Sequence, residues 1–135
     1  MSRKKVLFIC TSNSVRSQIA EAFLNNLYGD KYKAYSAGIN KTKVNPYAIK
    51  VMKEVGIDLS KHYSKRIDDF NDQDFDYVVT VCDNAKENCP FFPGKKVIHK
   101  NFKDPAIFNC SIENTIIEFK KIRDEIKNWI EYFFN

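Results

Sequence analysis

Residues 5–21 read KVLFICTSNSVRSQIAE and decide the fold of this chain. The apolar run at residues 6–9 has the length and composition of a buried strand. From residue 15 onward the apolar residues recur at helical spacing. Cys10 and Arg16 lie in the short polar turn between these two segments. The stretch therefore predicts a strand, a turn and a helix in direct succession.

The turn has the features of an anion-binding loop. A turn from a strand to the start of a helix directs backbone N–H groups toward one point, where the positive end of the helix dipole also acts. These groups would hold a tetrahedral oxyanion and would favour the thiolate of Cys10 beneath it. Arg16 would clamp two oxygens of phosphate or arsenate, and Ser17 would donate its hydroxyl group to the sulfur. The expected binding loop consists of Thr11, Ser12, Asn13, Ser14, Val15, Arg16 and Ser17.

The spacing of Cys10 and Arg16 is a weak signal when taken alone, because two fixed residues at a set distance often occur by chance. The alternative is a buried structural cysteine and a solvated arginine. The strand before the turn and the helix after it favour the reactive cysteine.

Length and composition limit the possible functions. The 135 residues are expected to form one domain over residues 1–135, and 44% hydrophobic and 29% charged residues are ordinary for a soluble globular protein. Since no apolar run could cross a bilayer and no signal peptide is recognisable, we expect a cytoplasmic protein without a membrane partner. The net charge of +5 comes from scattered lysines. It favours steering of an anionic substrate, or an ordinary solvated surface, over nucleic-acid binding.

Strands and helices alternate along the rest of the chain. Asn45 and Ser111 are expected to cap two of the helices, and Ile49, Met52 and Val55 are expected to face inward from the second helix. Alternating strands and helices build right-handed βαβ units. We therefore predict a single α/β domain with a four-stranded parallel sheet and helices on both faces. Further strands are expected at residues 33–37, 77–81 and 96–99, and helices at 15–28, 46–55, 66–70 and 112–133.

Four cysteines, at positions 10, 82, 89 and 110, indicate metal binding, redox chemistry or catalysis in a chain without signs of secretion. Cys82 ends a predicted strand or follows it directly, so it would emerge with Cys10 at the carboxyl edge of the sheet, where such sheets bind ligands. A disulfide between Cys82 and Cys89 would require the intervening segment to unwind. We favour a redox role over two unrelated buried cysteines or a metal site. Cys110 is expected to be structural.

Asp104-Pro105 follows the last predicted strand. Proline fixes the local backbone, and a carboxylic acid held there can protonate a leaving oxygen above the loop. Asp-Pro is also a common turn, but its place after the cysteine loop and a strand favours the catalytic role. His62 and His99 are expected to be surface or hydrogen-bonded residues without a catalytic role.

These residues resemble a known family, the thioredoxin-coupled arsenate reductases, which are built on the low-molecular-weight protein tyrosine phosphatase fold. Cys10, Arg16 and Asp104 are shared with the phosphatases, whereas Cys82 and Cys89 single out the reductases. The resemblance covers nearly the whole chain and includes residues 10–21, 35–39, 45–46, 52–58, 78–82, 89–90, 104–106 and 123–126.

The resemblance implies the reduction of arsenate to arsenite through a disulfide relay. The Cys10 thiolate would attack arsenic(V) held by the loop and Arg16, while Asp104 protonates the departing oxygen. Cys82 would then attack Cys10 and release arsenite, and Cys89 would attack Cys82 in turn. Thioredoxin would reduce the final disulfide, so no tightly bound cofactor and no metal are expected. We also expect the protein to be a monomer.

The chain departs from the family pattern at three places. Ser12 stands where the family has Gly, which indicates a position with unusual backbone dihedrals. Val15 stands where the family has a cysteine outside the relay. Tyr63 and Lys65 stand where some relatives carry residues that help to bind potassium. The Lys65 ammonium group is expected to take the place of the ion, so little potassium dependence is predicted. In those relatives the residues that bind potassium also include those matching Asn13, Glu21 and Ser36.

Two other functions stay open. A phosphotyrosine phosphatase would use the same Cys10, Arg16 and Asp104, but such phosphatases usually carry aromatic residues where this chain has Ala106 and Ile107. Weak phosphatase activity is expected in either case, because the loop accommodates phosphate. A non-enzymatic oxyanion-binding or thiol redox-sensing module would use the cysteines and leave Asp104 without a role.

Overall fold

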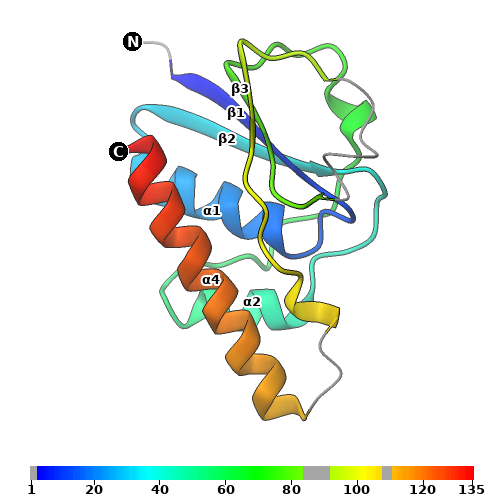
Figure 1. Cartoon of the computed structure of the whole chain (residues 1–135), viewed down its shortest axis with the longest axis vertical. Helices are drawn as coiled ribbons and strands as arrows, with labels where there is room; N and C mark the ends of the chain where they lie inside the picture. Colours follow the sequence, from blue (N-terminus) through cyan, green and yellow to red (C-terminus); the bar gives the residue numbers. More distant parts are fainter. Residues whose placement is uncertain (1–2, 84–91, 108–110) are drawn as a thin grey trace.

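Four parallel strands form one sheet, in the order β2-β1-β3-β4, in a computed structural model of the chain (Figure 1). Each pair of adjacent strands is parallel, as predicted. The strands are β1 (Lys4–Cys10), β2 (Tyr32–Gly38), β3 (Tyr77–Thr80) and β4 (Lys96–His99). The structure describes residues 3–83, 92–107 and 111–135.

The helices begin where the local sequence places them. Asn45 caps α2 by accepting a hydrogen bond from the Tyr47 N–H, with Pro46 in the first helical position. Ser111 caps α4 by accepting from the Asn114 N–H. No helix within the described part of the chain has the length and apolarity to span a membrane. The helices are α1 (Arg16–Tyr28), α2 (Pro46–Lys53) and α4 (Ile112–Phe134), with 3-10 helices η1 (Ile67–Phe70) and η2 (Pro105–Ile107).

Both faces of the sheet are covered. On one face, Phe8 of β1 packs edge-on against Phe134 of α4, and α1 lies beside α4 beneath the strands (Figure 1). On the other face, Tyr35 of β2 packs against Phe70 of η1. Tyr35 is the register partner of Leu7, so it points to the face opposite Phe8. The central strand β1 is therefore buried from both sides, which explains its continuous apolar run.

The inward face of α2 differs from the prediction. Val55 lies beyond the end of the helix and is 43% exposed, and Ile49 is only partly buried. The helix stops because Gly56, with a φ of 83°, reverses the chain, and the Ile57 N–H bonds back to the Met52 carbonyl. The buried residues of α2 are Ala48, Val51 and Met52.

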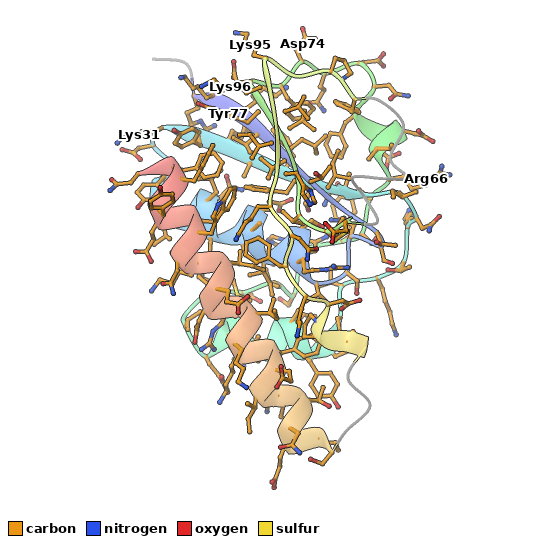
Figure 2. All side chains as sticks on the ribbon, in the orientation of Figure 1. Lys31, Arg66, Asp74, Tyr77, Lys95 and Lys96 are labelled. Carbon is orange, nitrogen blue, oxygen red and sulfur yellow. The ribbon has the colours of Figure 1, made fainter. Side chains whose placement is uncertain are left out.

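The carboxyl ends of the strands share one edge of the sheet. Arg66 forms an isolated bridge with Gly38 at the end of β2 and lies at this edge in Figure 2. The same edge carries Cys10, and the Val81 N–H just after β3 bonds to the carbonyl of Ile9. The opposite ends of β2, β3 and β4 are marked in Figure 2 by Lys31, Tyr77 and Lys96.

Candidate active site

A small cavity of about 160 Å³ lies at the carboxyl edge of the sheet, between β1 and α1. Cys10 and Arg16 line it from the turn after β1, and Asp104 lines it from the loop after β4. The fold therefore brings together three candidate residues that are far apart in the sequence. The complete lining is Cys10, Ser12, Ser14, Val15, Arg16, Thr42, Asp104 and Ala106.

The N-terminus of α1 opens beside this cavity. Val15 precedes the helix, and no side chain among the described residues caps it by a hydrogen bond. The first N–H groups of a helix lack partners within the helix, and the helix dipole makes this end positive. The start of α1 is therefore suited to an anion, as the sequence predicted for the turn.

The hydroxyl group of Ser17 is hydrogen-bonded to the sulfur of Cys10. The Cys10 Sγ and Ser17 Oγ atoms are 2.8 Å apart and both residues are buried. The same hydroxyl oxygen accepts a hydrogen bond of 2.8 Å from the Asn13 Nδ2 group. The Ser17 hydroxyl group can therefore accept from Asn13 and still donate its own proton to Cys10 when that sulfur is a thiolate.

The orientation of the Asn13 amide group follows from its other partners. Its Oδ1 atom accepts from the Lys65 N–H at 2.8 Å and from Gln18 Nε2 at 2.9 Å. An oxygen that accepts twice leaves the amide nitrogen to face Ser17. Asn13 has a φ of 50°, and within the described residues it is the non-glycine position with positive φ. The unusual dihedral suggested for Ser12 thus lies one residue later.

Gly38, at the end of β2, lets the sheet approach this loop. A Cβ atom at residue 38 would lie 2.7 Å from the Asn13 nitrogen and 2.6 Å from the Asn40 carbonyl oxygen. Both neighbours are backbone atoms, so no side-chain movement could relieve the contact. Sequence reasoning did not identify this role. The available signal was a glycine directly after a predicted strand.

Arg16 and Asp104 meet at the rim of the cavity. Arg16 Nη1 donates to the Phe102 carbonyl at 3.1 Å, and Nη2 lies 3.7 Å from Asp104 Oδ2. The other carboxylate oxygen of Asp104 accepts from the Ala106 N–H at 2.9 Å. This hydrogen bond within the turn at residues 104–106 therefore holds the Asp104 carboxylate over the cavity.

Cys82 lies two residues beyond β3 and is 2% exposed. Its Sγ atom lies 3.4 Å from Thr11 Oγ1, in the residue that follows Cys10. The sulfur therefore packs against the anion loop, at the edge where the sequence predicted it. Cys89 and Cys110 lie outside the described residues, so the contact between Cys82 and Cys89 stays a prediction.

Lys65 and Glu21 form a charged group behind the loop. Lys65 Nζ donates to the Tyr63 carbonyl at 2.9 Å and lies 3.9 Å from Glu21 Oε1. Burial lowers the pKa of Lys65, and the nearby Glu21 carboxylate opposes that shift. These residues do not fit a potassium ion, because an ammonium group already faces Glu21. Ser36 donates to the same Glu21 oxygen at 2.7 Å.

Both histidines are hydrogen-bonded, and neither lines the cavity. His62 Nδ1 lies 3.0 Å from Gln18 Oε1. His99 lies between Thr80 and Asp83, at 2.8 and 2.9 Å. In residues 3–83, 92–107 and 111–135, no cluster of three or more His, Cys, Asp and Glu side chains could hold a metal ion.

Sequence comparison relates the whole chain to known proteins. The family model described as low molecular weight phosphotyrosine protein phosphatase matches residues 5–135. Arsenate reductase 1 of Staphylococcus epidermidis is 50% identical over 135 residues, which cover 98% of this chain and 97% of that protein. An arsenate reductase of Staphylococcus aureus (strain Newman) is 46% identical over 134 residues, which cover 98% of each.

Solved structures show the same fold. One of them, described as an arsenate reductase in the phosphate binding state, is 34% identical with a TM-score of 0.78, over 96% of this chain and 95% of that one. A low molecular weight protein tyrosine phosphatase from T. tengcongensis is 26% identical with a TM-score of 0.71, over 95% of each chain. Reductases and phosphatases thus share this architecture.

Proposed function

Because the chain belongs to the low molecular weight phosphotyrosine protein phosphatase family, we propose that it uses the family's anion loop to reduce arsenate to arsenite. The observation that carries this proposal is the buried sulfur of Cys82, 3.4 Å from the hydroxyl oxygen of Thr11 in that loop. Hydrolysis of a phosphate ester needs one cysteine, whereas reduction needs a second sulfur beside the first. The names of the most similar relatives, all arsenate reductases, support the same choice.

The first step is nucleophilic attack by Cys10. The helix start and Arg16 would hold arsenate in the cavity, while the Ser17 hydroxyl group stabilises the thiolate. A bond forms between sulfur and arsenic(V) as an arsenic–oxygen bond breaks. Asp104, which lines the same cavity, would supply the proton with which that oxygen leaves as water.

The second step transfers two electrons to arsenic. The Cys82 thiolate attacks the sulfur of Cys10, and a Cys10–Cys82 disulfide forms. The electron pair of the broken sulfur–arsenic bond stays on arsenic, which leaves as arsenite in the +3 state. The position of Cys82 beside Thr11 supports this direct attack.

The third step regenerates Cys10. Cys89 would attack Cys82 to form a Cys82–Cys89 disulfide, which thioredoxin would then reduce. Electrons thus come from thioredoxin and no bound cofactor is required. Free thiols and a thioredoxin donor suit a reducing compartment, so we expect the protein to work in the cytoplasm. We also expect it to be a monomer.

Phosphate-ester hydrolysis is the second candidate. It would use Cys10, Arg16 and Asp104 in the same cavity, and the phosphate-bound relative supports anion binding by this loop. The small side chain of Ala106 lines the cavity where phosphatases usually carry an aromatic residue. Hydrolysis is therefore expected as a weak side activity on aryl phosphates.

The decisive experiment is arsenate-dependent NADPH oxidation with thioredoxin and thioredoxin reductase. The wild-type protein should turn over repeatedly, and Cys10→Ser should be inactive with both arsenate and aryl phosphates. Cys82→Ser and Cys89→Ser should lose repeated arsenate turnover but keep aryl phosphate hydrolysis. Repeated thioredoxin-dependent turnover by Cys82→Ser would contradict the relay. An absence of arsenate turnover in the wild type, with strong hydrolysis, would favour the phosphatase.

A further inference from the structure

His99 contacts Thr80 and Asp83, which lie on either side of Cys82 in the chain. Its Nδ1 atom lies 2.8 Å from Thr80 Oγ1, and its Nε2 atom lies 2.9 Å from Asp83 Oδ1. Thr80 and His99 are register partners on β3 and β4, so the first contact lies within the sheet. Asp83 lies beyond the end of the strand, directly after Cys82. The imidazole ring therefore bridges the chain across the cysteine.

The proton positions in this bridge follow from Asp83. An ionised carboxylate only accepts hydrogen bonds, so the Nε2 atom of His99 carries a proton and donates it to Asp83 Oδ1. In the neutral ring the Nδ1 atom is then an acceptor, and the Thr80 hydroxyl group donates to it. Both nitrogens of His99 are satisfied by residues on either side of Cys82.

Hydrogen bonds of the backbone also hold residues 80–83 in place. The Lys100 N–H donates to the Thr80 carbonyl at 2.9 Å, and the Phe102 N–H donates to the Val81 carbonyl at 3.0 Å. The Asp83 N–H donates to Asn101 Oδ1 at 3.1 Å. These contacts hold residues 80–83 along β4 and the loop after it. The His99 bridge joins side chains from both sides of Cys82.

We infer that His99 is a positioning residue, which holds Cys82 against the anion loop by binding Thr80 and Asp83. The inference rests on the proposed function, because positioning matters only if Cys82 attacks the sulfur of Cys10. An attacking atom must be held close to its target and in line with the bond that breaks. Without the bridge, the residues around Cys82 would sample more positions and the attack would be slower. Cys10 itself, which lies on β1, would be unaffected.

The test isolates the step in which Cys82 attacks. In a Cys89→Ser background, one equivalent of arsenate should drive one turnover that ends in the Cys10–Cys82 disulfide. The rate is followed by rapid alkylation of free thiols and mass spectrometry. Adding His99→Ala should slow disulfide formation by roughly ten- to a hundredfold. Hydrolysis of 4-nitrophenyl phosphate, which needs Cys10 but not Cys82, should stay within about twofold.

Three further variants separate positioning from general loss of structure. Val97→Ala changes an exposed side chain on the same strand and should leave both rates unchanged. Asp83→Ala should slow disulfide formation, and combining it with His99→Ala should cost little more, because each change breaks the same bridge. His99→Gln, whose amide group can still reach Asp83, should recover part of the rate.

The outcomes distinguish this inference from the proposed function. If the Cys89→Ser protein forms no Cys10–Cys82 disulfide with arsenate, the proposed function fails. If the disulfide forms at the same rate with and without His99, the proposed function stands and the positioning role is wrong. Equal losses of disulfide formation and phosphate hydrolysis in His99→Ala would also overturn the inference, since they would show a general structural effect.

Discussion

Gly38 and Asn13 are packed so closely that a Cβ atom at residue 38 would lie 2.7 Å from the Asn13 backbone nitrogen. Asn13 in turn donates to Ser17, which is hydrogen-bonded to the Cys10 sulfur. The end of β2 therefore supports the nucleophile through the backbone of the anion loop. A side chain at residue 38 would displace this loop rather than merely fill space.

Gly38→Ala should accordingly abolish arsenate reduction and phosphate hydrolysis, and should destabilise the protein by roughly 1–3 kcal/mol, as overpacking does. Thermal unfolding and the activity per folded molecule are the measurements. Gly56→Ala is the matched control, because Gly56 has a φ of 83° but open space around it. The control should lose stability and keep its activity. Wild-type activity in Gly38→Ala would show that the loop tolerates the displacement.

Ser17→Ala should slow the first chemical step, because it removes a hydrogen bond of 2.8 Å to the Cys10 sulfur. A hydrogen bond to a charged group contributes roughly 1.5–3 kcal/mol, so a loss of about ten- to a hundredfold is expected. Single-turnover rates with arsenate and with 4-nitrophenyl phosphate measure it, and both should fall together. An unchanged rate in a folded Ser17→Ala protein would count against a stabilised thiolate.

Asp104→Asn tests the proton donor. The amide oxygen can still accept from the Ala106 N–H, so the turn should be kept. Loss of a general acid costs roughly a hundred- to ten-thousandfold, and it matters most when the leaving group is a poor one. Phenyl phosphate hydrolysis should therefore fall much more than 4-nitrophenyl phosphate hydrolysis. Equal losses for the two esters would argue against proton donation. Asp124→Asn, on the exposed side of α4, is the control.

Lys65 is expected to make the activity indifferent to potassium. Its ammonium group faces Glu21 at 3.9 Å and donates to the Tyr63 carbonyl, where a cation would otherwise bind. Turnover in potassium chloride and in sodium chloride of equal ionic strength should agree within about twofold. Lys65→Asp would place two carboxylates together, and its activity should then rise with added potassium. A marked potassium effect on the wild-type protein would contradict this assignment.

Asp76 should make stability depend on pH in acid. Its carboxylate accepts from the Lys5 N–H at 2.8 Å and pairs with Lys95, which lowers the pKa of Asp76. A lowered folded-state pKa gives stabilisation that is present above the ordinary value, about 3.9, and lost as the pH falls through the folded value.

The free energy of unfolding of Asp76→Asn should therefore be about 1 kcal/mol below that of the wild type at pH 7, and the gap should close in acid. Urea unfolding at several pH values measures it. Asp74→Asn, at the upper end of the molecule in Figure 2, serves as the exposed control. A gap that stays constant down to pH 2 would mean that the charge of Asp76 is not responsible.

The sequence was sufficient for the architecture because its signals are local. The apolar run before Cys10, the caps at Asn45 and Ser111 and the periodic last helix each specify an element from neighbouring residues alone. Strand and helix bounds lie within two residues of the predicted ones. On the inward face of α2, Met52 is buried as predicted, but Val55 is exposed because the helix ends before the turn at Gly56.

The sequence also indicated which residues gather at the candidate site, since Cys10, Arg16 and Asp104 line one cavity. The distances between these side chains could not be predicted from the sequence. That Gly38 supports the loop, that Lys65 faces Glu21 and that His99 bridges Thr80 and Asp83 depend on contacts between residues far apart in the chain. Local propensity determines which elements form, whereas only the packing of those elements determines which side chains meet.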